Sequence, residues 1–297
     1  MTRTAAGAGV GAGAGAGATT AVTATTEAAA GVTATTAAAD VAATTEAAPG
    51  TASTPTQPSS PAPRVLVIVN DVDSPPGKFA DWLAEAGIDA DVRIAPETGV
   101  PEPTELDRVD GLILLGGGLM PDETDRAPWL RGEADLVRRA LDNDLPQLGV
   151  CLGGQLIAHV AGGTVQAQSG TPEKGYTWID LTEAAAEDPV FSAVSARPAF
   201  LESHVDRIVD LHAEAVLLAT SPACRIQAFR IGRAWGTQFH PEATAQNISR
   251  WDEEKLAKLG FNKDTLEREA EEREGDSLVE AKRLFTAFLT VVRDQRG

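Results

Sequence analysis

The chain contains few cysteines and aromatic residues, and it has far fewer basic than acidic residues. Its 297 residues include two cysteines, and Phe, Trp and Tyr together make up 5%. Asp and Glu number 43 against 25 Lys and Arg, which gives a formal net charge of −18. This charge argues against nucleic acid and anionic membrane surfaces as partners. No apolar run approaches the ~20 residues of a membrane span, and two cysteines suit a reducing cytoplasm, so a cytoplasmic protein is expected.

Large apolar side chains are nearly absent from residues 1–63. Residues 9–17 are mostly alternating Gly and Ala, and residues 49–63 are rich in proline. A segment of this composition cannot bury enough apolar surface to offset the entropy lost on ordering. We therefore expect a disordered tail and linker over residues 1–63. The alternative, a signal peptide, would need a more strongly apolar central region.

Apolar runs alternate with helical patterns from residue 64 onward. Residues 65–69, 110–115 and 147–150 have the composition of buried strands. Amphipathic or apolar helical patterns separate or follow them, at residues 79–86, 128–141 and 155–160. This alternation predicts an α/β fold of three layers, in which a mostly parallel sheet has helices on both faces, as in flavodoxin-like proteins. Shorter strands after residue 163 predict an antiparallel flank.

The last fifty residues differ in composition from this predicted domain, which we assign to residues 64–246. Residues 249–276 are densely charged, and residues 277–292 have the pattern of a final amphipathic helix. We expect residues 247–297 to form a charged helical extension that packs on the domain. The charged part is either a solvated helical face, a flexible arm or a docking site for a partner protein.

A cysteine between two glycines follows the strand at residues 147–150. The pattern Gly149-x-Cys151-x-Gly153 is typical of a nucleophile elbow, a tight turn between a strand and a helix. The glycines allow the close backbone contacts of such a turn, and the helix N-terminus favours a thiolate. The alternative is a buried structural cysteine.

A candidate base lies about ninety residues downstream, in Trp235-Gly-Thr-Gln-Phe-His-Pro-Glu242. A thiolate nucleophile needs a base, and the base needs a group that orients it. Pro241 favours an extended chain, in which His240 and Glu242 project to the same side. The sequence therefore predicts a Cys151, His240 and Glu242 triad. A surface histidine and a solvated glutamate are the alternatives.

Four stretches together resemble the class I glutamine amidotransferases, and the resemblance covers about residues 64–244. They are the elbow through Gln155, the Gln238-Phe-His240-Pro-Glu242 stretch, Leu114-Leu-Gly-Gly-Gly118 and Ser203-His-Val-Asp206. The last is similar to a stretch of GMP synthase amidotransferase domains. The resemblance implies hydrolysis of the γ-amide of glutamine through a thioester, with no cofactor and no metal.

The resemblance also implies an oxyanion hole and a substrate pocket. Backbone N–H groups of Leu152 and Gly117 would form the oxyanion hole. The substrate would contact residues of the glycine loop, the elbow helix and the Ser-His stretch, namely Gly116, Gly118, Gln155, Ser203 and His204. Alternatively, Gln155 is merely a polar residue at a helix start, and His204 with Asp206 is a local structural pair.

Some features of related enzymes are missing or altered. Many members carry Gly-Gly-Pro where this chain has Gly116-Gly-Gly118, and no ATP-pyrophosphatase loop or P-loop is present. Released ammonia would thus need an acceptor on a separate synthetase subunit. Two other functions stay open: a standalone γ-glutamyl peptide hydrolase, and a non-catalytic regulatory subunit with the same fold.

Overall fold

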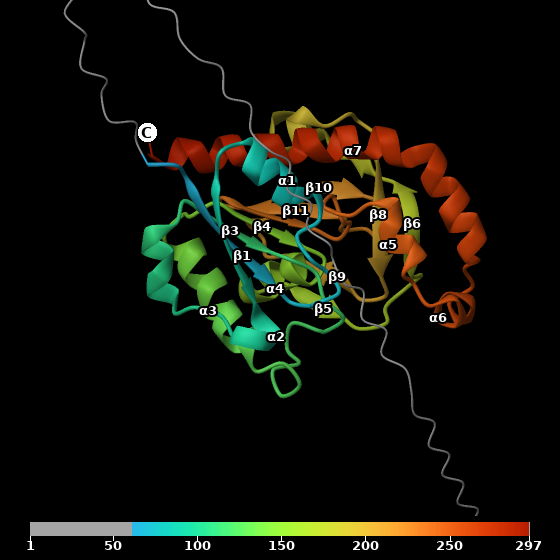
Figure 1. Ribbon diagram of the computed structural model, residues 1–297, viewed down its shortest axis with the longest axis horizontal. Helices are drawn as coiled ribbons and strands as arrows, with labels where there is room; N and C mark the ends of the chain where they lie inside the picture. The colour runs from blue at the N-terminus through green and yellow to red at the C-terminus, as the bar shows by residue number, and fades with distance from the viewer. Residues whose placement is uncertain (1–60, 297) are drawn as a thin grey trace, which may run out of the picture. The chain divides into compact units, whose positions relative to one another are not determined.

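The computed structural model describes residues 61–296, and the predicted tail lies almost entirely outside them. Eight strands form one sheet in the order β2-β1-β3-β4-β12-β11-β10-β7 (Figure 1). The strands of this sheet are β1 (Arg64–Val69), β2 (Asp89–Ile94), β3 (Gly111–Leu114), β4 (Gln147–Val150), β7 (Asp180–Leu181), β10 (Val216–Thr220), β11 (Ala228–Ile231) and β12 (Ala234–Thr237). The first four and β12 run parallel, whereas β11, β10 and β7 form an antiparallel flank.

Two short ladders and the helices complete the structure. The ladders are β5 (Thr164–Gln166) with β9 (Arg207–Asp210), and β6 (Glu173–Trp178) with β8 (Ala199–His204). The α-helices are α1 (Lys78–Glu85), α2 (Ala95–Thr98), α3 (Trp129–Asp142), α4 (Leu152–Val160), α5 (Ala245–Ser249), α6 (Glu253–Lys258) and α7 (Lys263–Arg293). Four 3₁₀ segments are Pro103–Arg108, Glu183–Glu187, Phe191–Ala193 and Asp294–Arg296.

The central sheet has a hydrophobic core on each face. In β1, Val65, Val67 and Val69 join a cluster that includes residues of α1 and α7, while Leu66 and Ile68 join one that includes residues of α3 and α4. Successive side chains of a strand point to opposite faces, so a run of consecutive apolar residues is needed to fill both cores. The three-layer α/β prediction is confirmed.

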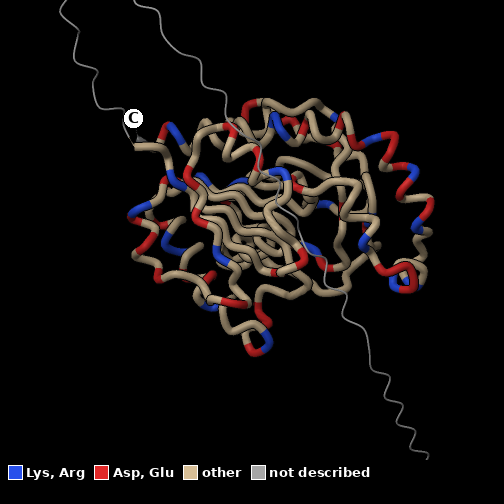
Figure 2. The backbone as a smooth tube through the Cα atoms, in the orientation of Figure 1, with Lys and Arg blue, Asp and Glu red and all other residues tan. Residues whose placement is uncertain are grey.

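The C-terminal helix α7 is continuous, which differs from the predicted division at residues 276 and 277. Its buried residues include Leu266, Ala270, Ser277, Ala281 and Leu284, spaced three, four or seven apart. This spacing keeps one buried stripe along the helix through the charged part. Figure 2 shows acidic and basic residues interspersed along the charged part of this helix, while the strands of the sheet carry few charges.

None of the helices among residues 61–296 is both long enough and apolar enough to span a bilayer. The division at residues 246 and 247 stays a prediction. The second half of α7 nevertheless packs in the same core cluster as α1 and β1.

Replacing Phe285 of α7 with alanine is expected to lower the free energy of unfolding by about 3–5 kcal/mol. The Phe285 ring is fully buried and stacks on Phe79 of α1 with ring centroids 3.9 Å apart. Denaturant unfolding monitored by tryptophan fluorescence measures the change. Val279→Ala is the control, because Val279 lies on the same helix and is 51% exposed. Equal losses in the two variants would show that α7 is not part of the core.

Candidate functional site

Cys151 occupies a strained turn between β4 and α4. Its φ is 51° and its ψ is −108°, a region that residues other than glycine rarely adopt. A methyl group on Gly149 would lie 2.4 Å from the carbonyl carbon of Gly153, and one on Gly153 would lie 2.2 Å from the Leu114 oxygen. Only glycine fits at either position, so the two glycines allow the start of α4 to pack against β3 and β4.

The Cys151 side chain lies at the carboxyl edge of the parallel strands, where it lines a cavity of about 300 Å³. The residue is 8% exposed. The predicted site residues Gly117, Gly118, Gln155, Ser203, His204 and His240 line the same cavity. The structure thus brings together, around one cavity, residues from separate stretches of the chain.

His240 follows β12 and is held by both its backbone and its ring. Its N–H donates to the Leu201 carbonyl at 2.8 Å, and its Nδ1 lies 2.8 Å from Oε1 of Glu242. A methyl group on Gly116 would lie 3.0 Å from Cε1 of His240 and 3.4 Å from Cβ of Cys151, so the imidazole and the cysteine adjoin the same glycine. The predicted triad residues therefore converge.

Burial disfavours the imidazolium form of His240, but its neighbours outweigh that effect. The charge of Glu242 and the contact with Cys151 raise the pKa of His240 well above its ordinary value. The Nε2 atom is buried and has no hydrogen-bond partner among the described residues. Catalytic hydrogen bonds are often long before substrate binds. The arrangement favours a protonated imidazole at His240 beside Cys151.

The glycine loop after β3 rests on a buried polar pair that the sequence did not reveal. The side-chain amide of Asn70, directly after β1, donates to the Leu115 carbonyl at 3.2 Å and to Glu133 of α3 at 2.9 Å. A methyl group on Gly117 would lie 3.2 Å from both Asn70 Cβ and Leu152 Cδ2. Asn70 and Glu133 therefore support the loop beside the start of α4. A glutamate on the apolar face of an amphipathic helix was the available signal.

Two buried glutamines connect Cys151 to the Ser-His stretch. The Gln238 amide donates to Cys151 Sγ at 3.6 Å, and the Gln155 amide donates to Gln238 Oε1 at 3.2 Å and to the Asp206 carbonyl at 3.3 Å. His204 Nδ1 contacts the same carbonyl at 3.1 Å. The predicted His204–Asp206 pair thus involves the Asp206 backbone. Gln238 belongs to the motif around His240, but sequence reasoning gave it no role.

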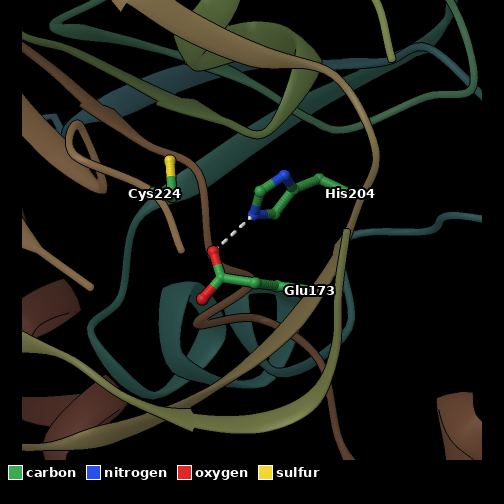
Figure 3. A group of neighbouring side chains, drawn as sticks. All are labelled: Glu173, His204 and Cys224. Carbon is green, nitrogen blue, oxygen red and sulfur yellow. Dashed lines mark hydrogen bonds and ion pairs between the residues drawn. The ribbon is translucent and has the colours of Figure 1, made fainter. Parts of the chain in front are cut away.

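A buried polar cluster lies on the other side of His204, and Figure 3 shows three of its members, Glu173, His204 and Cys224. Glu173 accepts hydrogen bonds from Ser221 at 2.7 Å and Gln227 at 2.8 Å, and its second oxygen lies 3.1 Å from His204 Nε2. Both oxygens of Glu173 are therefore satisfied by protein groups.

This cluster has three potential metal ligands, but their hydrogen bonding does not favour a metal. Burial raises the pKa of Cys224 to about 12, and its thiol donates to the Ile226 carbonyl at 3.3 Å. A metal-binding cysteine must be a thiolate, and a metal would displace the partners of Glu173. The cluster fits a structural hydrogen-bond network that holds His204 in place.

A second and larger cavity, of about 920 Å³, adjoins the first. The two cavities share Ser74, Ser203 and His240 in their linings. Glu274 and Leu278 of α7 also line the larger cavity. The C-terminal helix therefore contributes to the surroundings of His240 as well as to the core.

Comparisons with known proteins find a matching family model and several relatives. The family model of class-I glutamine amidotransferases matches residues 78–256. A subunit of the glutamine-hydrolysing GMP synthase of Methanosarcina barkeri is 33% identical over 183 residues, which cover 60% of this chain and 87% of the relative. The corresponding protein of Thermoplasma acidophilum is 30% identical over 166 residues, which cover 54% of this chain and 76% of the relative. The crystal structure of a glutamine amidotransferase of Thermotoga maritima has a TM-score of 0.69 and 27% identity, with 78% of this chain and 99% of that chain covered.

Replacing Glu133 with glutamine is expected to make stability less dependent on pH. Burial raises the pKa of Glu133 from 4.5 to about 7, against the opposing hydrogen bond from Asn70. Between pH 4.5 and about 7, the Glu133 carboxyl therefore keeps its proton in the folded state but loses it in the unfolded chain. Stability from this group falls as pH rises through that window, by roughly 3 kcal/mol in all. Chemical denaturation of both proteins at pH 4.5 and pH 8 measures the difference, and parallel pH profiles would contradict it.

Alkylation is expected to distinguish the two cysteines. Cys151 lines a cavity, whereas Cys224 is fully buried with its thiol hydrogen-bonded. Iodoacetamide should add one group to the native protein, on Cys151, and two after denaturation. Peptide mass spectrometry measures the positions. Labelling of Cys224 in the native protein at a similar rate would contradict the burial and hydrogen bonding of its thiol.

Proposed function

Because this chain belongs to the class-I glutamine amidotransferase family, we propose that it hydrolyses the γ-amide of glutamine with Cys151 as nucleophile. The observation that carries the proposal is the convergence of Cys151, His240 and Glu242 at the carboxyl edge of the sheet, next to a cavity. A strained cysteine whose neighbouring histidine is oriented by a carboxylate is suited to acyl transfer.

In the first half of the reaction, the Cys151 thiolate attacks the γ-carbonyl carbon. The imidazolium of His240 then gives its proton to the amide nitrogen, the C–N bond breaks, and ammonia leaves a thioester on Cys151. Glu242 accepts a hydrogen bond from Nδ1 of His240, which keeps Nε2 directed at the reacting atoms. The amide of Gln238 positions the sulfur.

In the second half, His240 removes a proton from water, which attacks the thioester carbon. The C–S bond breaks, and glutamate is released while the proton of its new carboxyl group passes to solvent. The Cys151 thiolate and the His240 imidazolium are thereby restored. No external oxidant or cofactor enters either half of the reaction.

The negative oxygen of both tetrahedral intermediates needs hydrogen-bond donors. Leu152 is the first residue of α4, and the N–H groups of a first helical turn lack helical acceptors. Gly117 approaches Leu152 and has no side chain to block its N–H. The backbones of Leu152 and Gly117 form the oxyanion hole, and each donor contributes about 3 kcal/mol to transition-state stabilisation.

The remainder of the substrate occupies the 300 Å³ cavity. Gly116 and Gly118 flank the oxyanion donor, while the backbone around Ser203 and His204 holds the α-amino-acid end. The side-chain N–H groups of Gln155 are engaged with Gln238 and Asp206 in the unliganded structure. Gln155 therefore acts on the substrate either through Gln238 or after exchanging one of these hydrogen bonds.

The relatives favour delivery of the ammonia to a separate synthetase. The matched protein of Methanosarcina barkeri is described as a subunit of a glutamine-hydrolysing GMP synthase. The acceptor of this chain would accordingly be a second protein that contains an ammonia-dependent synthetase. The cytoplasmic location expected from the cysteine content stays a prediction.

A second candidate function is hydrolysis of γ-glutamyl peptides or other γ-glutamyl amides. One observation favours it. The 920 Å³ cavity shares His240, which protonates the leaving nitrogen, with the 300 Å³ cavity that Cys151 lines, here called the nucleophile cavity. This space is far larger than ammonia requires, and it would accept a leaving amino acid. Steady-state comparison of glutamine with γ-glutamylglycine separates the two functions, since the true donor has the higher kcat/KM.

Replacing Cys151 with alanine is expected to lower glutaminase turnover by about 10⁴-fold or more. Glu242→Gln is expected to cost about 10²- to 10⁴-fold, because the amide no longer supports the imidazolium. Ammonia release, measured with glutamate dehydrogenase, tests both variants. Cys224→Ala is the matched cysteine control and should retain wild-type turnover. Activity that survives in Cys151→Ala would refute the assignment of the nucleophile.

A further inference from the structure

Lys174 of β6 lies beside the nucleophile cavity but has no part in the proposed reaction. In the antiparallel ladder of β6 and β8, Lys174 pairs with Ser203, and Glu173 pairs with His204. Because side chains alternate along a strand, the Glu173–His204 pair and the Lys174–Ser203 pair face opposite sides of the ladder. Glu173 lies in the buried polar cluster, whereas Lys174 carries a cation to the cavity, which His204 at the end of β8 also lines.

The ammonium group of Lys174 is fixed at the wall of the cavity. Its Nζ donates to Ser203 Oγ at 2.9 Å and lies 5.3 Å from the ring centroid of Trp251. Lys174 and Cys151 line the same cavity. Trp251 lies between α5 and α6, so the C-terminal segment helps to hold this lysine.

The charge of Lys174 is not neutralised by a neighbouring side chain. Among the ion pairs between residues 61 and 296, none involves Lys174, so no carboxylate oxygen lies within 4.0 Å of Nζ. Burial lowers the pKa of Lys174, against the opposing influence of Cys151 and Glu202. A partly buried ammonium with one neutral acceptor has unused hydrogen-bonding capacity, which an anion could satisfy.

The charges around the cavity match an amino-acid group better than an uncharged ligand. Lys174 lies in a lining that also contains the acidic residues Asp71 and Asp206, each of which accepts one backbone hydrogen bond through its carboxylate. Lys174 supplies the only lysine or arginine charge of this lining among the described residues. A ligand with a carboxylate and an ammonium group would find opposite charges for both. A purely structural role for Lys174 is less consistent with this lining, because a leucine or methionine would pack on Trp251 without the cost of burying a charge.

Resting on the proposed amide hydrolysis, we propose that Lys174 binds a carboxylate of the substrate and thereby selects γ-glutamyl donors over amides that lack a free carboxylate. Two carboxylates can supply this chemistry. One is the α-carboxylate of the glutamyl group, and the other is the carboxylate of an amino-acid leaving group. Lys174 is thus a specificity-determining residue, which contacts the substrate away from the reacting bond.

Two matched pairs of amides test the proposal with Lys174→Met. Glutamine and glutamine α-amide differ in the α-carboxylate, while γ-glutamylglycine and γ-glutamylethylamide differ in a carboxylate on the leaving group. Lys174→Met is expected to affect the pair that differs in the carboxylate bound by Lys174. For the member of that pair that carries the carboxylate, kcat/KM should fall about 10- to 100-fold, mainly because KM rises. The other member of that pair should change little.

Two further variants complete the design. Lys174→Arg keeps the charge and should restore part of the discrimination, whereas Lys258→Met removes an exposed lysine of α6 and should behave as wild type. The proposal is wrong if Lys174→Met lowers kcat/KM by the same factor for all four amides. A uniform loss would mean that the lysine only supports the local structure.

Binding of glutamate, measured by calorimetry, tests Lys174 without turnover. Wild-type protein should bind this product at least about 10-fold more tightly than Lys174→Met does. If glutamate binding depends on Lys174 but none of the four amides is hydrolysed, the proposed function fails and the carboxylate site stands. If glutamate binds equally to both proteins, or to neither, recognition of the α-carboxylate is refuted. The carboxylate site is then refuted altogether unless Lys174→Met also changes the preference for γ-glutamylglycine over γ-glutamylethylamide.

Discussion

The contact of backbone with backbone at the start of α4 is the constraint on which the rest of the site depends. Gly149 and Gly153 approach one another, and Gly153 approaches the Leu114 carbonyl, more closely than any side chain would permit. This contact forces Cys151 into a positive φ and turns its sulfur toward the edge of the sheet. The glycine loop after β3 and the histidine after β12 then reach the sulfur because their strands flank β4 in the sheet.

Two carboxyl groups are buried beneath this edge of the sheet. Glu133 and Glu202 are fully buried, and burial raises the pKa of both carboxyl groups. The nearby charge of Glu173 acts in the same direction on Glu202. A neutral carboxyl avoids the cost of an unpaired buried charge and still orients its neighbours. Lys174 and the imidazole of His240, by contrast, line the cavity beside Cys151.

Much of this architecture could be predicted from local patterns. The apolar runs predicted the parallel strands, and the spacing of Gly149, Cys151 and Gly153 predicted the turn, because both depend on neighbours in sequence. The support of the glycine loop by Asn70 and Glu133 could not be predicted, since these residues are 63 positions apart. The continuity of α7 was also missed, because a charged helical surface concealed the narrow stripe that tertiary contacts bury.

The position of α7 in the chain has a consequence for synthesis on the ribosome. Phe285 and its neighbours cover the same sheet face as Phe79 of α1, which is made about two hundred residues earlier. Until α7 leaves the exit tunnel, that apolar face stays uncovered and open to chaperones or aggregation. Truncated mRNAs that end before α7 would therefore yield aggregation-prone, protease-sensitive polypeptides, even though they encode Cys151, His240 and Glu242.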